Sequence, residues 1–220
     1  AYVYRALTLM SRIATVLGKD DDAAILGREA ADLSKAFNRI FFDRKKKCYV
    51  DGEGAGHASL HTNMFALIFG LVPEKHKAAV TRFILSRGMA CSVYGAQFLL
   101  EALYEGGAGG EALALMTDTS KRSWYNMLRA GSTITLEAWD DSFKPNQDWN
   151  HLWGAAPGNI IPFRLMGVTP AEPGFSKVLV KPQPGGLEHA GMTVPTIRGT
   201  ISIEITDTPQ ERSVSVDLPA

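Results

Sequence analysis

The segment Gly167-Val-Thr-Pro-Ala-Glu-Pro-Gly174 divides the sequence into two parts with different hydrophobic periods. Its two glycines and two prolines are typical of a loop between regular elements. Before it, apolar residues recur at the three-and-four spacing of helices, and after it they recur at every second residue, as in strands. The segment therefore predicts a mainly helical part over residues 1–166 and a small β unit over residues 167–220.

The helical part is predicted to consist of paired helices joined by short turns. The first helix has one apolar face and ends at Gly18, a residue type that often follows a helix. The second begins at Asp20-Asp-Asp22, because acids suit the positive end of a helix dipole, and it ends at Phe41-Phe42. Further helical stretches are predicted over residues 57–70, 74–85, 94–104, 111–116, 120–129 and 150–166. No fixed-length repeat accompanies these pairs, which favours a bundle or a toroid of inner and outer helices over a repeat array.

The β part shows three alternating segments rich in β-branched residues, over residues 177–182, 200–206 and 213–218. Pro-Gly-Gly and Asp-Thr-Pro turns separate them. So few strands are not stable alone. We therefore expect this sheet to pack against the helices or against strands outside the sequence.

The balance of charges argues against partners that are attracted by a strong electrostatic field of the protein. The 220 residues contain 23 Lys and Arg and 23 Asp and Glu, so the formal net charge is +0. Neither a nucleic acid nor a membrane surface is predicted as a partner. The basic run Arg44–Lys47 lacks interleaved aromatic residues and is predicted to be a solvated turn. The longest apolar runs, such as 64–72, are shorter than the ~20 residues that a membrane span needs.

No cofactor or metal site is predicted. Cys48 and Cys91 are far apart and in no metal-binding spacing, so two separate structural thiols are expected rather than a disulfide. His57 and His61 lie four residues apart, as two zinc ligands on one helix would, but no third ligand follows. Zinc is therefore only a weak alternative there.

The stretch from Gly131 to Gly154 holds the residues best suited to chemistry. It combines carboxylates, carboxamides, a histidine and three of the four tryptophans. The β-branched residues after Gly131 disfavour a helix, so Glu137 is expected on a turn or an extended loop, with Trp139 on the same side. A carboxylate beside aromatic surface can act as a general base. On the pattern alone, a surface glutamate or a partner for Arg129 is the favoured interpretation, since charged residues are mostly exposed.

His151 and Trp153 form a second pair two residues apart. A neutral imidazole can hydrogen-bond a sugar hydroxyl while an indole covers a ring face. A buried histidine with satisfied hydrogen bonds explains the same pattern.

Four segments, in chain order, resemble bacterial α-L-rhamnosidases of glycoside hydrolase family 78: Ser92-Val-Tyr-Gly-Ala-Gln, Gly131-Ser-Thr-Ile-Thr-Leu-Glu-Ala-Trp, Asp148-Trp-Asn-His-Leu-Trp-Gly and Lys181-Pro-Gln-Pro-Gly. This resemblance implies an (α/α)6 toroid followed by a β-sandwich domain. Residues 1–166 would be the C-terminal portion of the catalytic toroid, and residues 167–220 a β-sandwich-like C-terminal domain.

The resemblance also implies an activity, which is the hydrolysis of terminal α-L-rhamnosides with inversion. Glu137 matches the glutamate of the family pattern Gly-x-Thr-x-x-x-Glu-x-Trp and would be the general base. His151 would touch the sugar, and Trp139 and Trp153 would shape its pocket. Tyr94 and His61, at expected helix starts, would face the same mouth.

The family's general acid would lie upstream of Ala1, so this chain alone is expected to hydrolyse nothing. The first residues, Ala1-Tyr-Val-Tyr-Arg, carry no targeting pattern and already fit a helix, so we expect a piece of a longer protein and predict no compartment. Exposed inner-helix faces would favour a homodimer. Two alternatives stay open: another toroidal glycosidase, acting on fucosides or glucans, and a non-catalytic carbohydrate-binding or scaffold piece.

Overall fold

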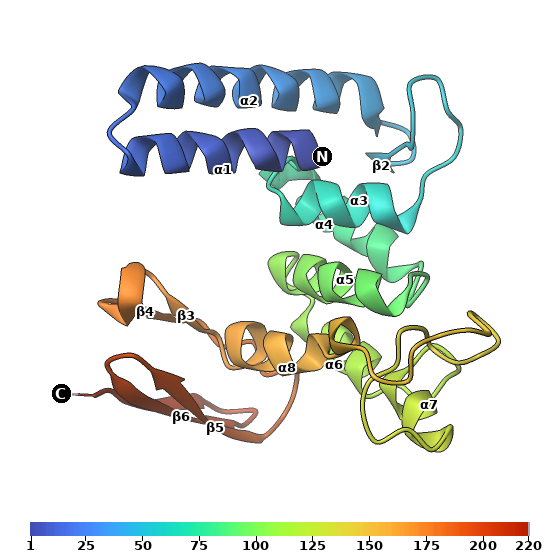
Figure 1. Ribbon diagram of the computed structural model, residues 1–220, viewed down its shortest axis with the longest axis vertical. Helices are drawn as coiled ribbons and strands as arrows, with labels where there is room; N and C mark the ends of the chain where they lie inside the picture. Colours follow the sequence, from blue (N-terminus) through green and yellow to red (C-terminus); the bar gives the residue numbers. More distant parts are fainter. Residues whose placement is uncertain (220) are drawn as a thin grey trace. The chain divides into compact units, whose positions relative to one another are not determined.

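The computed structural model describes residues 1–219, and the chain forms two compact units, one of Ala1–Ala90 and one that begins at Cys91. The first unit opens with two helices, α1 (Tyr2–Val16) and α2 (Asp20–Phe41). They lie side by side and antiparallel (Figure 1). The turn between them uses Gly18 at a φ of 67°, where a side chain would be strained. The predicted helical hairpin is confirmed almost to the residue.

A short hairpin of strands β1 (Phe42–Asp43) and β2 (Cys48–Tyr49) follows α2, where the sequence predicted only a loop. Its turn is the basic run Arg44–Lys47, and the Asp43 carboxylate accepts hydrogen bonds from the backbone N–H groups of Lys45 and Lys46, at 2.8 and 3.0 Å. The run is thus the expected exposed turn. Two-residue strands are too short to show a period in the sequence.

Helices α3 (Leu60–Ile68) and α4 (Glu74–Leu85) complete the first unit. Helix α3 begins three residues later than predicted, because Ser59 caps it and accepts a hydrogen bond from the Thr62 N–H at 3.2 Å. The core includes Tyr49, whose backbone N–H and carbonyl both bond the Asn63 side chain, at 2.8 and 3.0 Å. This buried carboxamide therefore ties β2 to α3 and has its polar atoms satisfied.

The second unit begins with α5 (Val93–Glu105), α6 (Gly109–Met116) and α7 (Trp124–Arg129). Helix α7 starts after Ser123 rather than at Ser120, because Ser123 Oγ accepts the Asn126 N–H at 3.1 Å. The predicted continuous helix over 150–166 is instead three short turns: η1 (Leu152–Gly154), α8 (Ala156–Ile160) and the π-helical η2 (Ile161–Leu165). Pro157 and Pro162 cannot donate backbone hydrogen bonds, which breaks the regular ladder.

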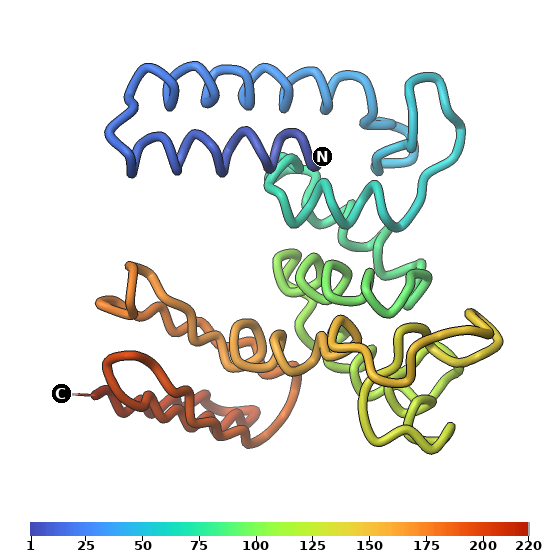
Figure 2. Tube along the Cα trace, in the orientation of Figure 1, coloured from blue at the N-terminus to red at the C-terminus, as the bar shows by residue number. Residues whose placement is uncertain are grey.

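Two antiparallel sheets follow. Strands β3 (Val168–Pro170) and β4 (Val178–Val180) form one of them. The other is a meander of β5 (His189–Thr196), β6 (Gly199–Asp207) and β7 (Arg212–Asp217) (Figure 2). Strand β5 was not predicted, since Gly191 and Pro195 interrupt its pattern, but it is an edge strand, where proline is tolerated. Alternate positions of β6 are buried, at Ile201, Ile203 and Ile205.

The segment after Gly167 is hydrogen-bonded to the helices of its own unit. Lys181 donates its backbone N–H to the Gly167 carbonyl at 2.9 Å, and Gln183 donates its own to the Leu165 carbonyl at 2.9 Å. The Gln183 carboxamide also donates to the Tyr104 carbonyl, at 3.2 Å. These bonds join the start of the β part to helices of the same compact unit. The predicted domain boundary stays a prediction.

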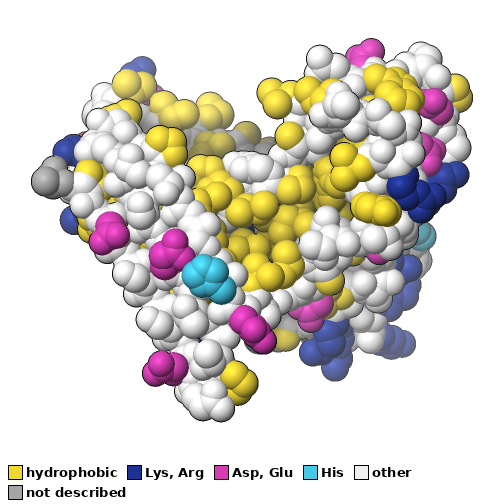
Figure 3. Space-filling view, turned by 90° about the horizontal axis from the view of Figure 1, so that it is seen from below, with side chains coloured by type: hydrophobic (Ala, Val, Ile, Leu, Met, Phe, Trp, Pro, Cys, Tyr) yellow, Lys and Arg dark blue, Asp and Glu magenta, His cyan; other side chains and the backbone are white. Residues whose placement is uncertain are grey.

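Several large hydrophobic side chains are exposed in each unit, and Figure 3 shows hydrophobic side chains on one face of the molecule. On α1 the exposed large hydrophobic residues are Tyr2, Val3, Leu9, Met10, Ile13 and Val16. Cys48 and Cys91 are both buried and are not joined by a disulfide, as expected. Within residues 1–219, no helix combines the length and the apolarity that crossing a membrane requires.

Candidate active site

The irregular segment between α7 and η1 is anchored by two tryptophans. Trp139 is 2% exposed and donates its indole N–H to the Cys91 carbonyl at 2.8 Å. Trp124 donates its indole N–H to the Gly154 carbonyl at 2.7 Å, and its ring meets that of Trp139 edge to face at 5.3 Å. A loop that is anchored by such packed and hydrogen-bonded indole rings is held in one conformation. Trp139 therefore has a packing role, and its predicted contact with a sugar stays a prediction.

Asp140 also holds this loop. One of its carboxylate oxygens accepts hydrogen bonds from the backbone N–H and hydroxyl of Ser142, and the other accepts from the Asn126 carboxamide at 3.0 Å. The Ser142 hydroxyl, with Asn126, holds the pKa of Asp140 below its usual range. The Asn126 carboxamide donates to the Trp139 carbonyl as well, at 3.1 Å. Asp140 is thus engaged in shaping the loop.

Asp141 has a similar place in the loop. Its carboxylate accepts a hydrogen bond from the buried Gln147 carboxamide at 2.7 Å. The carboxamide oxygen of Gln147 in turn accepts the backbone N–H of Ala138 at 2.9 Å. This bridge connects the two ends of the loop on either side of residues 140–146.

Two stretches of backbone then run next to each other and bring Glu137 and His151 onto neighbouring segments. His151 donates its backbone N–H to the Thr135 carbonyl at 2.9 Å, and the Thr135 hydroxyl donates to the His151 carbonyl at 2.8 Å. Glu137 donates its backbone N–H to the Asp148 carbonyl at 3.0 Å. Gly154 packs directly against this pair of segments and leaves no room for a side chain, since a Cβ there would stand 2.8 Å from the Leu136 carbonyl oxygen. The predicted loop position of Glu137 is confirmed.

Both oxygens of the Glu137 carboxylate are held. Oε1 accepts a hydrogen bond from the Lys144 ammonium, and Oε2 accepts the backbone N–H of Asp148 at 3.0 Å. The Glu137 side chain is only 13% exposed. The Lys144 hydrogen bond first, then the Asp148 N–H, lower the pKa of Glu137, and the nearby His151 acts in the same direction. At neutral pH this carboxylate is ionised and can accept a proton. The alternative of an Arg129 partner is not what the structure shows, because the cation at Glu137 is Lys144.

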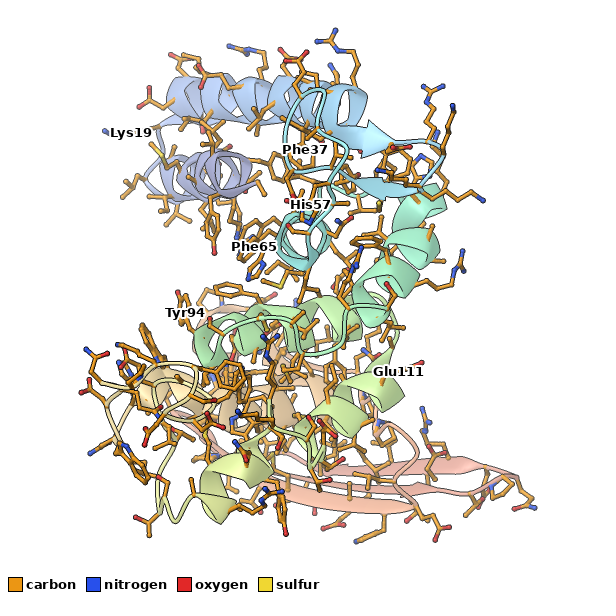
Figure 4. All side chains as sticks on the ribbon, turned by 90° about the vertical axis from the view of Figure 1, so that its right-hand side faces the viewer. Lys19, Phe37, His57, Phe65, Tyr94 and Glu111 are labelled. Atoms are coloured by element: carbon orange, nitrogen blue, oxygen red, sulfur yellow. The ribbon has the colours of Figure 1, made fainter. Side chains whose placement is uncertain are left out.

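Three aromatic side chains predicted at the site form one group. The His151 imidazole stacks on the Trp153 ring, with centroids 4.0 Å apart and planes 10° apart. Trp153 also contacts Tyr94 at 5.2 Å, and Tyr94 lies at the start of α5 (Figure 4). Trp153 is 40% and Tyr94 49% exposed. The group therefore presents aromatic surface to solvent, and His151 is not a buried core histidine.

His61 belongs to the first unit, where it is exposed on α3. It lines a cavity of about 450 Å³ together with Asp51, Thr62 and several aromatic side chains. Burial alone would raise the pKa of Asp51, but hydrogen bonds from Thr62, Ser59 and His57 outweigh it and hold that pKa well below the usual range. His57 thus pairs with Asp51. Among residues 1–219, no three His, Cys, Asp or Glu side chains are grouped as a metal ion would need.

Sequence reasoning missed the side chains that hold the site together: Asn126, Thr135, Lys144 and Gln147. Lys144 lies seven residues after Glu137, beside Pro145 and Asn146. The only local signal was that Pro-Asn pair, which indicates a turn but not which carboxylate the turn meets. Their roles depend on contacts between segments.

Two family models together match nearly all of the chain. The bacterial α-L-rhamnosidase six-hairpin glycosidase domain matches residues 1–164, and the bacterial α-L-rhamnosidase C-terminal domain matches residues 167–220. Among curated proteins, an α-L-rhamnosidase of Alteromonas sp. is 27% identical over 100% of this chain and 25% of its own length. One from Streptomyces avermitilis is 27% identical over 92% of the chain and 20% of its own length. The chain thus spans about a quarter of the length of such relatives.

Solved structures agree with this fold. An α-L-rhamnosidase from Dictyoglumus thermophilum superposes with a TM-score of 0.83 at 24% identity, over 98% of this chain and 25% of that one. The Streptomyces avermitilis α-L-rhamnosidase complexed with L-rhamnose gives 0.80 at 22% identity, over 98% and 22%. The fold is therefore the C-terminal part of an (α/α)6 toroid followed by a small β unit. With family models matching along nearly its whole length, the chain belongs to the bacterial α-L-rhamnosidases.

Proposed function

We propose that the full-length protein is a glycoside hydrolase that removes terminal α-L-rhamnose from an oligosaccharide or another glycoside, with inversion. In this proposal residues 1–166 belong to the catalytic toroid and residues 167–220 to the β domain that follows it. Support comes from membership of the family and from relatives that are named α-L-rhamnosidases.

Glu137 is the proposed general base, and its held, ionised carboxylate is the observation that carries the proposal. In an inverting reaction a carboxylate takes a proton from water as that water attacks the anomeric carbon. The bond to the leaving oxygen breaks at the same time, and an acid protonates that oxygen. Each carboxylate oxygen has two lone-pair directions, and Lys144 and Asp148 occupy one on each oxygen. A lone pair therefore remains for the water.

The aromatic group next to this carboxylate suits a sugar. An exposed indole face packs against the C–H groups of a pyranose, while a histidine nitrogen bonds a hydroxyl. His151 is the proposed hydrogen-bonding group, and Trp153 and Tyr94 the proposed apolar surface. The assignments of Trp139 and His61 as sugar contacts remain part of the proposal, without added support from their positions.

The second carboxyl group of the mechanism is proposed to lie outside these 220 residues. Inverting pairs stand roughly 6.5 to 9.5 Å apart with the water between them. The two nearest aspartates in sequence, Asp140 and Asp141, are engaged in hydrogen bonds within the loop. The 220-residue chain alone is accordingly expected to be inactive on an aryl α-L-rhamnoside.

The test of the base is Glu137→Gln in the full-length protein, assayed with an aryl α-L-rhamnoside. The amide keeps the shape but cannot take a proton, so kcat should fall about 10²- to 10⁴-fold. Glu172→Gln is the matched control, since Glu172 pairs with Lys177 at 2.6 Å far from the loop in sequence, and it should leave kcat unchanged. Near-normal turnover by Glu137→Gln would remove Glu137 from the reaction.

The substrate assignment has its own test. The full-length protein should hydrolyse the aryl α-L-rhamnoside faster than the matching fucoside and glucosides, and proton NMR should show the β anomer of rhamnose forming first. A preference for a fucoside, or sugar binding without any hydrolysis, would favour the alternative functions.

A further inference from the structure

The backbone of Lys144 is held in place by hydrogen bonds within the loop. Its backbone carbonyl accepts the Gln147 N–H at 3.1 Å, which closes a turn over Pro145 and Asn146. Gln147 is 7% exposed and bonds both Asp141 and Ala138. The Lys144 side chain therefore starts from a fixed Cα. Only its side-chain torsions remain to be ordered by an ion pair.

The contact of Lys144 with Glu137 differs from an ordinary surface ion pair. Its ammonium donates to Glu137 Oε1, while the Asp148 N–H holds the other carboxylate oxygen at 3.0 Å. The glutamate side chain is 13% and the lysine side chain 42% exposed, so water competes less than at a fully exposed pair. Two donors on different oxygens fix the rotation of the carboxylate plane, which one donor would not do.

We propose that Lys144 is the positioning residue of the proposed base: its ammonium fixes the orientation of the Glu137 carboxylate and keeps it in the ionised form that takes a proton from water. This inference rests on the proposed function. Lys144 is given no contact with the sugar, and it acts only through Glu137.

The charged groups around Glu137 set the direction of its pH dependence. Lys144 and His151 are the side chains that act on its charge in the second unit, and both lower its pKa, together with the Asp148 backbone N–H. Asp140 is held by Ser142 and Asn126 instead. Removing the Lys144 charge should therefore raise the pKa of Glu137. A general base accepts a proton only at pH values above its pKa. The acidic limb of the pH profile of kcat/KM should therefore move to higher pH.

The experiment compares Lys144→Met and Lys144→Arg in the full-length protein. Methionine keeps the length of the stem and removes the charge, so kcat at the pH optimum should fall by up to about 100-fold, with KM changed little. The acidic limb of kcat/KM should move to higher pH. Arginine keeps a charged donor and should restore the position of the limb and most of kcat. Lys177→Met is the matched control, because it removes a lysine paired with Glu172, and it should change neither.

The outcomes separate this inference from the function it rests on. If Glu137→Gln is inactive but Lys144→Met keeps the kcat and acidic limb of the unmodified protein, the positioning role is wrong and the base assignment stands. A fall in kcat with an unmoved limb and no rescue by arginine would also overturn it, because loss of loop structure alone explains that pattern. If Glu137→Gln is active, the proposed function itself fails. Should the methionine variant not fold, as judged by circular dichroism, Lys144→Gln takes its place with the same expectations.

Discussion

Gly154→Ala is a small substitution that should displace the loop carrying Glu137. Gly154 does not have a positive φ, so alanine is compatible with its backbone and the effect is one of space. The added Cβ would stand 2.8 Å from the Leu136 carbonyl oxygen and 2.8 Å from Thr135 Cβ. Ordinary contact begins at 3.4 Å, so the two segments must separate by about 0.6 Å. Gly154 cannot simply retreat, because the Trp124 indole holds its carbonyl at 2.7 Å.

This displacement should be measurable as local opening. Forcing one methyl group into a packed position costs about 1–3 kcal/mol, which corresponds to roughly 5- to 150-fold faster exchange of the amides that depend on the contact. The affected amides include that of His151, which bonds the Thr135 carbonyl. The assay is hydrogen exchange read by mass spectrometry on peptides covering residues 130–154 of the full-length protein. In parallel, kcat on an aryl α-L-rhamnoside should fall about tenfold, because the base and its water lose alignment.

Gly158→Ala is the matched control. Gly158 lies in α8, and a Cβ there would meet no heavy atom within 4 Å. Replacing a helical glycine by alanine should be neutral or stabilise by about 0.5–1 kcal/mol. Unchanged exchange and unchanged turnover in Gly154→Ala would refute the reasoning, and so would an equal effect of the two substitutions.

Three more substitutions test other parts of the structure. Gly167→Ala should reduce the yield of soluble full-length protein and cost at least about 2 kcal/mol, because Gly167 has a φ of 71° and a Cβ would collide with the Lys181 carbonyl. Trp139→Phe removes the indole bond to the Cys91 carbonyl and part of a buried ring; a lower thermal midpoint, from a loss of about 2 kcal/mol, is expected, and an unchanged midpoint would argue against the anchor. Asp51→Asn should speed amide exchange at the start of α3 near neutral pH. Since the folded pKa of Asp51 is depressed, its stabilisation is present above the unfolded pKa of about 3.9 and is lost as pH falls, so the difference between the variant and the unmodified protein should narrow in acid.

Local signals were enough for much of the helical part. Gly18 and the three acids after Lys19 mark the turn between α1 and α2, and helix α4 has the predicted bounds after Pro73. Such stops and starts depend on backbone geometry within a few residues. Strand β5 was missed for the opposite reason: its proline is acceptable only because it lies at a sheet edge, which the sequence does not reveal.

The candidate site divides in the same way. The glycine and β-branched residues before Glu137 indicated a loop, and the spacing of His151 and Trp153 indicated an aromatic pair, which the structure contains. The sequence also predicted that Trp139 contacts a sugar; this residue is 2% exposed in the structure, and the contact stays a prediction. Alternation in an extended segment predicts a shared face, but this segment is not a regular strand, so the alternation does not apply.

The sequence by itself therefore determined most of the helices before residue 130, the change from helices to strands near Gly167, and the stretch that carries Glu137 and His151. These follow from interactions between residues close in the chain. Only the tertiary structure decided which donors hold the Glu137 carboxylate and what supports the loop beneath it. Trp139 reaches a carbonyl 48 positions away in the chain, and that contact forms only when the apolar rings are buried together. Burial of the tryptophan rings positions the loop, and the loop in turn places Lys144 at the Glu137 carboxylate.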